Sequence, residues 1–73
     1  MEIHERIKAT REDKDILQKD AAEFLGVSDK QIRRWENGES EMGILKLQKL
    51  CLYYGVSADY ILGLPRGLDW PRR

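Results

Sequence analysis

Glycines at short intervals limit this chain to short elements of secondary structure. Five of the six glycines, at positions 26, 38, 43, 55 and 63, separate segments in which apolar residues recur every three or four positions. This spacing is typical of amphipathic helices, and a glycine after the last apolar residue commonly ends a helix. Both prolines lie in the last nine residues, so no earlier proline interrupts helical hydrogen bonding. The pattern predicts an all-α chain.

Five short helices followed by an irregular tail are expected. The helical ranges indicated by the periodicity are about 2–14, 18–25, 28–37, 43–54 and 57–62. Residues 1–63 are expected to form one domain, because 73 residues leave no room for a second core. Residues 64–73 contain both prolines and are expected to form the tail.

Two of these segments carry more specific signatures. Ser28 is followed three residues later by Gln31, which matches a capping box at the start of a helix. The segment 43–54 has apolar residues at spacings of three and four, which place them on one helical face. We expect this face to supply the core through Ile44, Leu47, Cys51 and Tyr54.

Composition narrows the classes of function. The 13 basic and 13 acidic residues give zero net charge, so charge alone indicates no polyanionic partner. A single cysteine and a single histidine exclude an internal disulfide and a Cys/His zinc site, and we expect no metal or cofactor. No apolar stretch approaches the ~20 residues that cross a bilayer, and the N-terminus lacks the pattern of a signal peptide. We therefore expect a cytoplasmic protein that does not contact membranes.

Residues 18–37 have the pattern of a helix-turn-helix. Two helices that cross steeply at a three-residue turn need small residues where they touch. Ala22 supplies the small contact, and Gly26 permits a positive φ at the turn. The side chains expected to pack between the two helices are Leu25, Val27, Ile32 and Trp35. The coincidence of all these offsets within about twenty residues is far more specific than any one of them.

The segment 28–37 is basic on the side opposite its apolar face. At 100° per residue, Ile32 and Trp35 point one way, whereas Lys30, Arg33 and Arg34 cluster on the other side. A helix that is apolar behind and basic in front suits the major groove of DNA. The alternative for the three basic residues is an ordinary solvated helix face.

The basic face predicts specific contacts to double-stranded DNA. Lys30 and Arg34 lie one turn apart and suit guanine O6 and N7. Asp29 either accepts from a cytosine N4 or only stabilises the positive end of its helix. The residues predicted to contact bases are Asp29, Lys30, Gln31 and Arg34, of which Gln31 can also reach a phosphate. Those predicted to contact phosphates are Ser28, Arg33 and Asn37.

Residues 6–63 resemble the Cro/cI repressor-like helix-turn-helix family, also called Xre-type regulators. The matching residues are Arg6-Ile7-Lys8, Arg11, Gln18, Ala22, Leu25-Gly26-Val27-Ser28, Ile32, Trp35-Glu36-Asn37-Gly38, Leu47, Leu50 and Gly55-Val56-Ser57. The run Arg34-Trp35-Glu36-Asn37-Gly38 is the most specific. The resemblance implies a five-helix, lambda-repressor-like DNA-binding domain. It also implies a transcriptional repressor, found on the nucleoid, that binds a palindromic operator as a homodimer.

The resemblance also assigns roles to residues that periodicity leaves open. It places Gln18 on a DNA phosphate, and it pairs Arg11 with Glu36 as a buried ion pair between the first and third helices. From the sequence pattern alone, Arg11 and Glu36 would be interpreted as two more surface charges. The sequence departs from the family at three positions. Asp15 stands where the family usually has glycine, and Leu17 stands where it usually has a polar N-cap residue. Thr10 stands where it usually has a large apolar residue.

A second apolar line predicts a homodimer. Leu45 and Leu52 lie seven residues apart, where the family is usually polar, with Tyr53 beside them. Tyr60 stands where the family usually has an acid, and Leu64 begins a tail that also contains Leu68 and Trp70. We expect a symmetric interface through residues 43–62, with Leu52 and Tyr60 near the two-fold axis. The alternative is that the tail folds back over Leu52 and Tyr53 of its own chain.

Two classes of function remain open at the level of sequence. The first is the DNA-binding regulator, which needs no catalytic residue, and we find no plausible catalytic set. The second is an antitoxin-like module whose main partner is another protein, because one fold serves both purposes. An enzyme is not expected.

Overall fold

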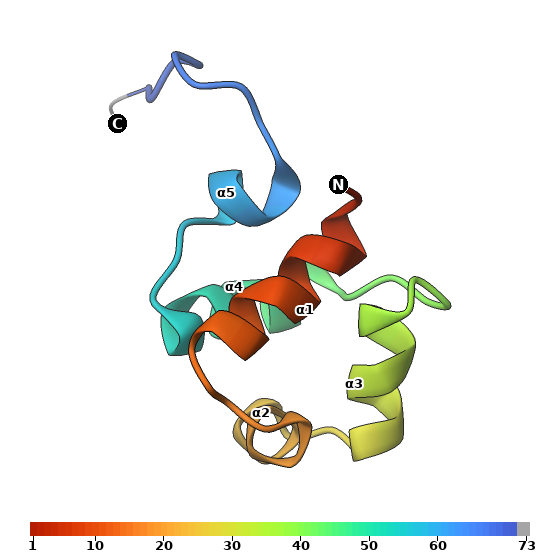
Figure 1. Ribbon diagram of the computed structural model, residues 1–73. Helices are drawn as coiled ribbons and strands as arrows, with labels where there is room; N and C mark the ends of the chain where they lie inside the picture. Colours follow the sequence, from red (N-terminus) through yellow and green to blue (C-terminus); the bar gives the residue numbers. More distant parts are fainter. Residues whose placement is uncertain (72–73) are drawn as a thin grey trace.

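The computed structural model describes residues 1–71, and all regular secondary structure in that range is helical (Figure 1). The helices are α1 (Ile3–Asp13), α2 (Gln18–Leu25), α3 (Asp29–Glu36), α4 (Ile44–Tyr54) and α5 (Ala58–Leu62). The expected all-α architecture is confirmed, and each expected helix is present. Residues 64–71 contain no helix. None of the helices in this range is long and apolar enough to span a bilayer.

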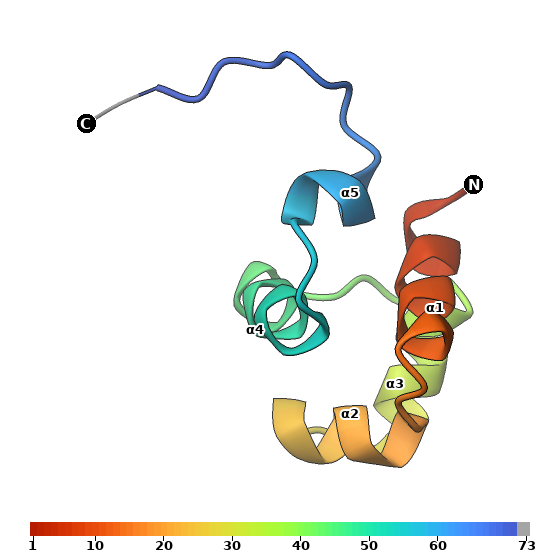
Figure 2. The same cartoon turned by 60° about the vertical axis from the view of Figure 1, so that its left-hand side comes forward.

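The helices surround one core. In both views α5 lies at one end of the domain and α2 at the other, with α1 and α4 between them (Figure 1, Figure 2). Neighbours in space follow the order α1, α3, α2, α4 and α5, and α5 packs back against α1. This arrangement places α3 on the outside of the domain with one face toward the core.

The core is built from ten buried apolar residues contributed by all five helices. They are Ile7, Ala21, Ala22, Leu25, Ile32, Trp35, Leu50, Cys51, Tyr54 and Ile61. Burial of one large apolar side chain stabilises the fold by about 1.5–3 kcal/mol. Cys51 is therefore a small core residue, as expected, and its burial raises the pKa of the thiol.

The expectation that Ile44 belongs to the core is wrong. Its side chain is 83% exposed, and Leu50 is buried on α4 instead. Ile44 is the first residue of α4, where no neighbouring helix covers it, although it shares a helical face with Leu47 and Cys51. Leu47 is half-buried, so burial on this face increases toward the C-terminal end of the helix.

The capping box expected at α3 forms only in part. Ser28 Oγ accepts from the Gln31 backbone N–H at 3.1 Å, which satisfies one free donor of the first turn. The Gln31 side chain does not return to Ser28, because its Nε2 donates to Ser40 Oγ at 3.2 Å. Gln31 thereby connects the first turn of α3 to the loop that follows the helix.

The turn between α1 and α2 contains Asp15, the residue that stands where the family usually has glycine. Asp15 has φ +56°, and it is the one residue other than glycine with positive φ in the described range. Glycine adopts this conformation without strain, and Asp tolerates it better than most residues. Leu17 occupies the N-cap of α2 without a side-chain hydrogen bond, as its apolar side chain requires.

A buried ion pair joins α1 to α3. Arg11 Nε donates to Glu36 Oε2 at 2.6 Å, and Arg11 Nη2 donates to Glu36 Oε1 at 3.1 Å. The hydrogen bond to Glu36 raises the pKa of Arg11. Arg11 Nη1 also donates to the Ile16 carbonyl at 2.8 Å, and Gln18 Nε2 donates to Glu36 Oε1 at 3.0 Å. The network therefore connects α1, the turn after it, α2 and α3.

Removal of one member of the ion pair should strongly destabilise the domain. Glu36→Gln or Arg11→Met leaves a buried charge without its partner, and such changes cost about 3–5 kcal/mol. That is a large share of the ~5–15 kcal/mol of a small domain. The double variant Arg11→Met/Glu36→Leu should lose less than the two single losses combined, because it buries no charge.

Urea denaturation followed by circular dichroism measures these free energies of unfolding. Lys8→Met is the matched control, because Lys8 is an exposed base on the same helix and its loss should change stability by no more than about 0.5 kcal/mol. Single variants as stable as Lys8→Met would show that the ion pair does not hold α1 and α3 together.

Candidate nucleic-acid interface

Helices α2 and α3 form a helix-turn-helix. Gly26 ends α2 in the left-handed conformation at φ +72°, and the Val27 N–H closes the turn on the Ala22 carbonyl at 3.0 Å. Ala22 and Leu25 are buried between the helices together with Ile32 and Trp35, whereas Val27 is half-buried. The small residue and the positive φ lie where a steep crossing across a short turn requires them.

A lysine of α4 binds to the end of α2 in the helix-turn-helix. Lys46 Nζ donates to the Leu25 carbonyl at 2.7 Å, at the negative end of α2. A cation at a helix C-terminus is favoured by the helix dipole and satisfies a free carbonyl. The contact was missed at the level of sequence, because it joins residues 21 positions apart and no local pattern signals it.

The exposed side of α3 is basic. Lys30, Arg33 and Arg34 are exposed, while Ile32 and Trp35 behind them are buried. Within residues 1–71, none of the three basic side chains forms an ion pair or a side-chain hydrogen bond. Their charges are therefore available to a ligand, although the chain as a whole is neutral.

The start of α3 is exposed and polar. Ser28 and Asp29 are both exposed, and Asp29 lies in the first turn, where the helix dipole favours a negative charge. Gln31 is half-buried and donates one amide proton to Ser40. Its second amide proton and its oxygen remain available to a base edge or a phosphate.

Two residues assigned to phosphates are tied to other side chains. The Gln18 amide lies at the start of α2 and donates to Glu36 within the ion-pair network. Asn37 Nδ2 donates to Glu39 Oε2 at 3.3 Å, which places a carboxylate beside it. Arg33 has no such partner in the described chain. Of the residues assigned to phosphates, Arg33 is thus the one that brings an unpaired positive charge.

The residues predicted to form a dimer interface lie on α4, α5 and the tail. Leu45, Leu52, Tyr60 and Leu64 are exposed, with Leu52 at 76% and Tyr60 at 55%. Tyr53 differs, because it is half-buried and its ring stacks on Phe24 of α2 with centroids 4.2 Å apart. Residues 64–71, the described part of the tail, do not cover these residues, since they run clear of the helices in both views (Figure 1, Figure 2).

Comparisons with known proteins agree with this geometry. Residues 7–61 match the family described as Helix-turn-helix. The chain is 36% identical over 58 residues to YonR of Bacillus subtilis (strain 168), described as an SPbeta prophage-derived uncharacterized HTH-type transcriptional regulator. The matched region covers 80% of this chain and 54% of YonR, so the chain spans about half the length of that relative.

A solved structure has the same fold. The P22 c2 repressor protein, crystallised in complex with synthetic operator 9T in the presence of Tl⁺, superposes with a TM-score of 0.78 at 34% identity. The superposition covers 85% of this chain and 94% of that one. Residues 7–61, which match the family, include the whole of the α2–α3 unit. The chain therefore belongs to the helix-turn-helix family, within the Cro/cI-type regulators that its sequence resembles.

Proposed function

We propose that this protein is a sequence-specific DNA-binding transcriptional regulator that represses by occupying an operator. The observation that carries the proposal is the exposed, unpaired basic face of α3 on a helix whose opposite side is buried. Such a helix fits the major groove, which is wide enough to admit it. The likeness to a repressor solved with its operator and to a transcriptional regulator supports the same function. Occupying an operator requires no enzymatic activity, and we expect none.

Lys30 and Arg34 are the proposed base-reading residues. They lie one turn apart on the exposed side of α3 and are free to reach guanine O6 and N7. Gln31 and Asp29, near the start of the helix, are proposed to reach neighbouring base edges. Arg33 lies beside this row and is proposed to bind a phosphate, with Ser28, Gln18 and Asn37 around it.

The network behind α3 is proposed to hold it in position for the groove. Glu36 at the end of α3 is fixed by Arg11, and Gln31 at its start is linked to Ser40. A side chain that is already positioned loses less conformational freedom on binding, which favours affinity. The protein is thus proposed to present a held reading helix with a local basic face, on a chain whose net charge is zero.

A gel shift with duplex DNA and a salt titration tests DNA binding directly. Binding through phosphates releases counterions, so the affinity should fall steeply as salt increases. Absence of binding at low salt, together with a tightly co-purifying protein, would instead support an antitoxin-like module.

Replacement of Arg34 should relax sequence preference, whereas replacement of Arg33 should not. Arg34→Ala removes a guanine contact, which should cost about 1–3 kcal/mol of binding free energy and relax preference at one base pair per half-site. Arg33→Ala should weaken binding to all sequences nearly equally and reduce the salt slope by about 1. Both residues are exposed on α3, so each variant is a matched control for the other. An unchanged sequence preference in Arg34→Ala would contradict the assignment.

We also propose that the protein binds a palindromic operator as a symmetric homodimer. One helix-turn-helix makes few base contacts, and dimers of this kind place their reading helices on half-sites one turn of DNA apart, about 34 Å. The exposed apolar residues Leu45, Leu52 and Tyr60 are the candidate interface residues on α4 and α5.

The variant Tyr60→Asp should dissociate the dimer. It places a charge where two copies of Tyr60 approach the two-fold axis, and like charges repel across such an interface. Light scattering at micromolar concentration should give the mass of a dimer for the wild type and of a monomer for the variant. Leu17→Asp is the control, because Leu17 is a similarly exposed apolar residue at the N-cap of α2, where Asp is favoured. A wild type that stays monomeric on DNA would overturn the proposed dimer.

A further inference from the structure

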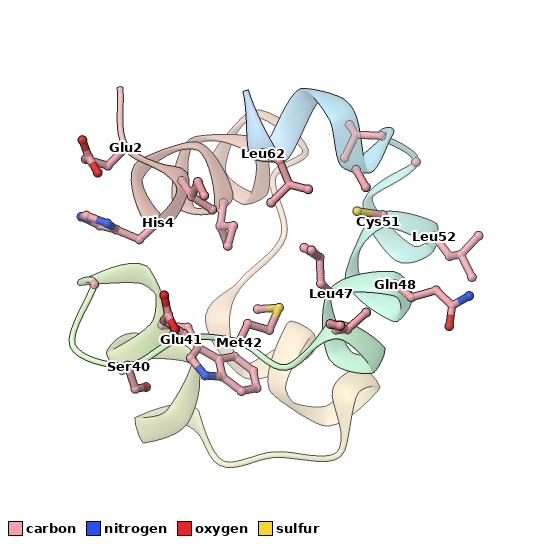
Figure 3. Close-up of a pocket in the computed structure, with 18 residues that line it drawn as sticks. Glu2, His4, Ser40, Glu41, Met42, Leu47, Gln48, Cys51, Leu52 and Leu62 are labelled. Atoms are coloured by element: carbon pink, nitrogen blue, oxygen red, sulfur yellow. The ribbon is translucent and has the colours of Figure 1, made fainter. Parts of the chain in front are cut away.

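An apolar groove opens beside the buried face of α3, since Trp35 lines it and the three basic residues of that helix do not. It has a volume of about 1020 Å³ and lies between the start of α1, the α3–α4 loop, α4 and α5 (Figure 3). Met42 and Leu47 lie deep in it, and Leu62 closes it from α5. The sequence did not signal this feature, because its walls come from four separate parts of the chain.

The walls of the groove expose large apolar side chains to solvent. Ile44 is 83% exposed at the start of α4, and Ile3 lies on the α1 side of the groove. Leu52 is 76% exposed at the edge of the groove, with its side chain directed outward (Figure 3). Isolated exposed apolar residues are ordinary, but several around one hollow mark a binding surface. Two carboxylates, those of Glu2 and Glu41, line the end of the groove near the start of α1.

The tail carries apolar side chains that no other residue among 1–71 covers. Leu64, Leu68 and Trp70 are all exposed, and Trp70 is 85% exposed. The tail runs outward from α5 without returning to the helices (Figure 2). Pro65 disfavours helix in the residue before it, and Arg66 and Gly67 form a turn in which Gly67 has φ +89°. The tail is therefore irregular and bends once between Leu64 and Leu68.

The end of α5 directs the tail away from its own groove. Gly63 has φ +68°, and the N–H groups of Gly63 and Leu64 bond to the carbonyls of Tyr60 and Asp59 at 3.2 and 3.0 Å. These two bonds fix the direction in which the chain leaves the helix. The guanidinium of Arg6 packs against Gly63, at the position that a side chain would occupy. No tail residue within the described chain lines the groove.

We propose that the groove of each copy receives residues 64–70 of a second copy. The apolar tail side chains match the apolar walls, and Arg66 of the tail complements the carboxylates of Glu2 and Glu41 at the end of the groove. Leu52 lies both at the edge of the groove and in the proposed dimer surface, so one interface continues into the other. This inference rests on the proposed homodimer and adds a reciprocal exchange of tails to it.

The exchange is large enough to matter for dimer stability. A buried aromatic residue removes about 150–250 Å² of surface from water. Each tail carries one tryptophan and two leucines, and each groove wall that covers a tail is buried with it. For the two tails and two grooves together, the buried surface is on the order of 1,200 Å², the lower limit of a standard stable interface. Contact between α4 and α5 of the two copies adds to that area.

Separate variants of the tail and of the groove in the 73-residue chain test the exchange. Leu68→Ser/Trp70→Ser removes the tail side chains, and Ile44→Asp places a charge in the groove wall. Neither change should affect folding, because the tail residues and Ile44 are exposed and an acid is favoured in the first turn of α4. Each should raise the dimer dissociation constant at least tenfold in sedimentation equilibrium, while the far-ultraviolet circular dichroism spectrum keeps its helical signal because the fold of each copy is unchanged. Leu17→Asp should leave the constant unchanged.

Mixing the two variants gives the decisive result. The tail variant keeps an intact groove and the groove variant keeps an intact tail, so one complete tail–groove pair can form between them. We expect the average mass to rise above that of either variant alone. The tryptophan emission should also shift to shorter wavelength, because Trp70 of the groove variant becomes buried on mixing. No change in mass or emission on mixing would overturn the exchange.

The outcomes separate this inference from the proposed function. If the tail variant remains a dimer as tight as the wild type, the exchange is wrong while the α4–α5 dimer stands. If the variants become monomers but the wild type binds no duplex in the gel shift, the exchange stands and the DNA-binding proposal is wrong. A wild type that is monomeric at all concentrations overturns the exchange, and the gel shift then tests DNA binding on its own.

Discussion

The buried pair of Arg11 and Glu36 is the contact on which the orientation of α3 depends. Glu36 follows Trp35 at the end of α3, so its position sets the direction in which the basic side of the helix points. Arg11 uses three nitrogen atoms, two on Glu36 and one on the Ile16 carbonyl, and Gln18 adds a further donor to the carboxylate. A buried charge is tolerated when its hydrogen-bonding capacity is filled in this way. Three helices thereby meet at one carboxylate.

This chain has no net charge, but it presents a positive surface because its basic and acidic residues lie on different parts of the fold. Lys30, Arg33 and Arg34 project from one side of α3 without partners in the described chain, and the acidic residues lie mostly on other elements. Exposed apolar residues lie on other elements, namely α4, α5 and the tail. The surface proposed to read DNA and the surface proposed to join two copies therefore consist of different residues, which would allow both to be used at once.

Much of the fold could be predicted because its signals are local. Apolar spacing gave the helices, and the need for positive φ at Gly26 gave the turn. The features that the sequence did not predict depend on contacts between distant parts of the chain. Ile44 has the spacing of a core residue but no helix covers it, and the side chain of Gln31 bonds to Ser40 rather than back to Ser28. The stacking of Tyr53 on Phe24 also joins two separate helices. The groove likewise needs four segments to be assembled before it exists.

The most direct test of the account is selection of bound sites from a random duplex library with the wild-type protein. A pair of reading helices related by two-fold symmetry should enrich a palindrome whose half-sites are centred about 10–10.5 base pairs apart, and each half-site should contain guanines for Lys30 and Arg34. A library that shows no enrichment after selection, or that yields one motif without symmetry, would contradict the account.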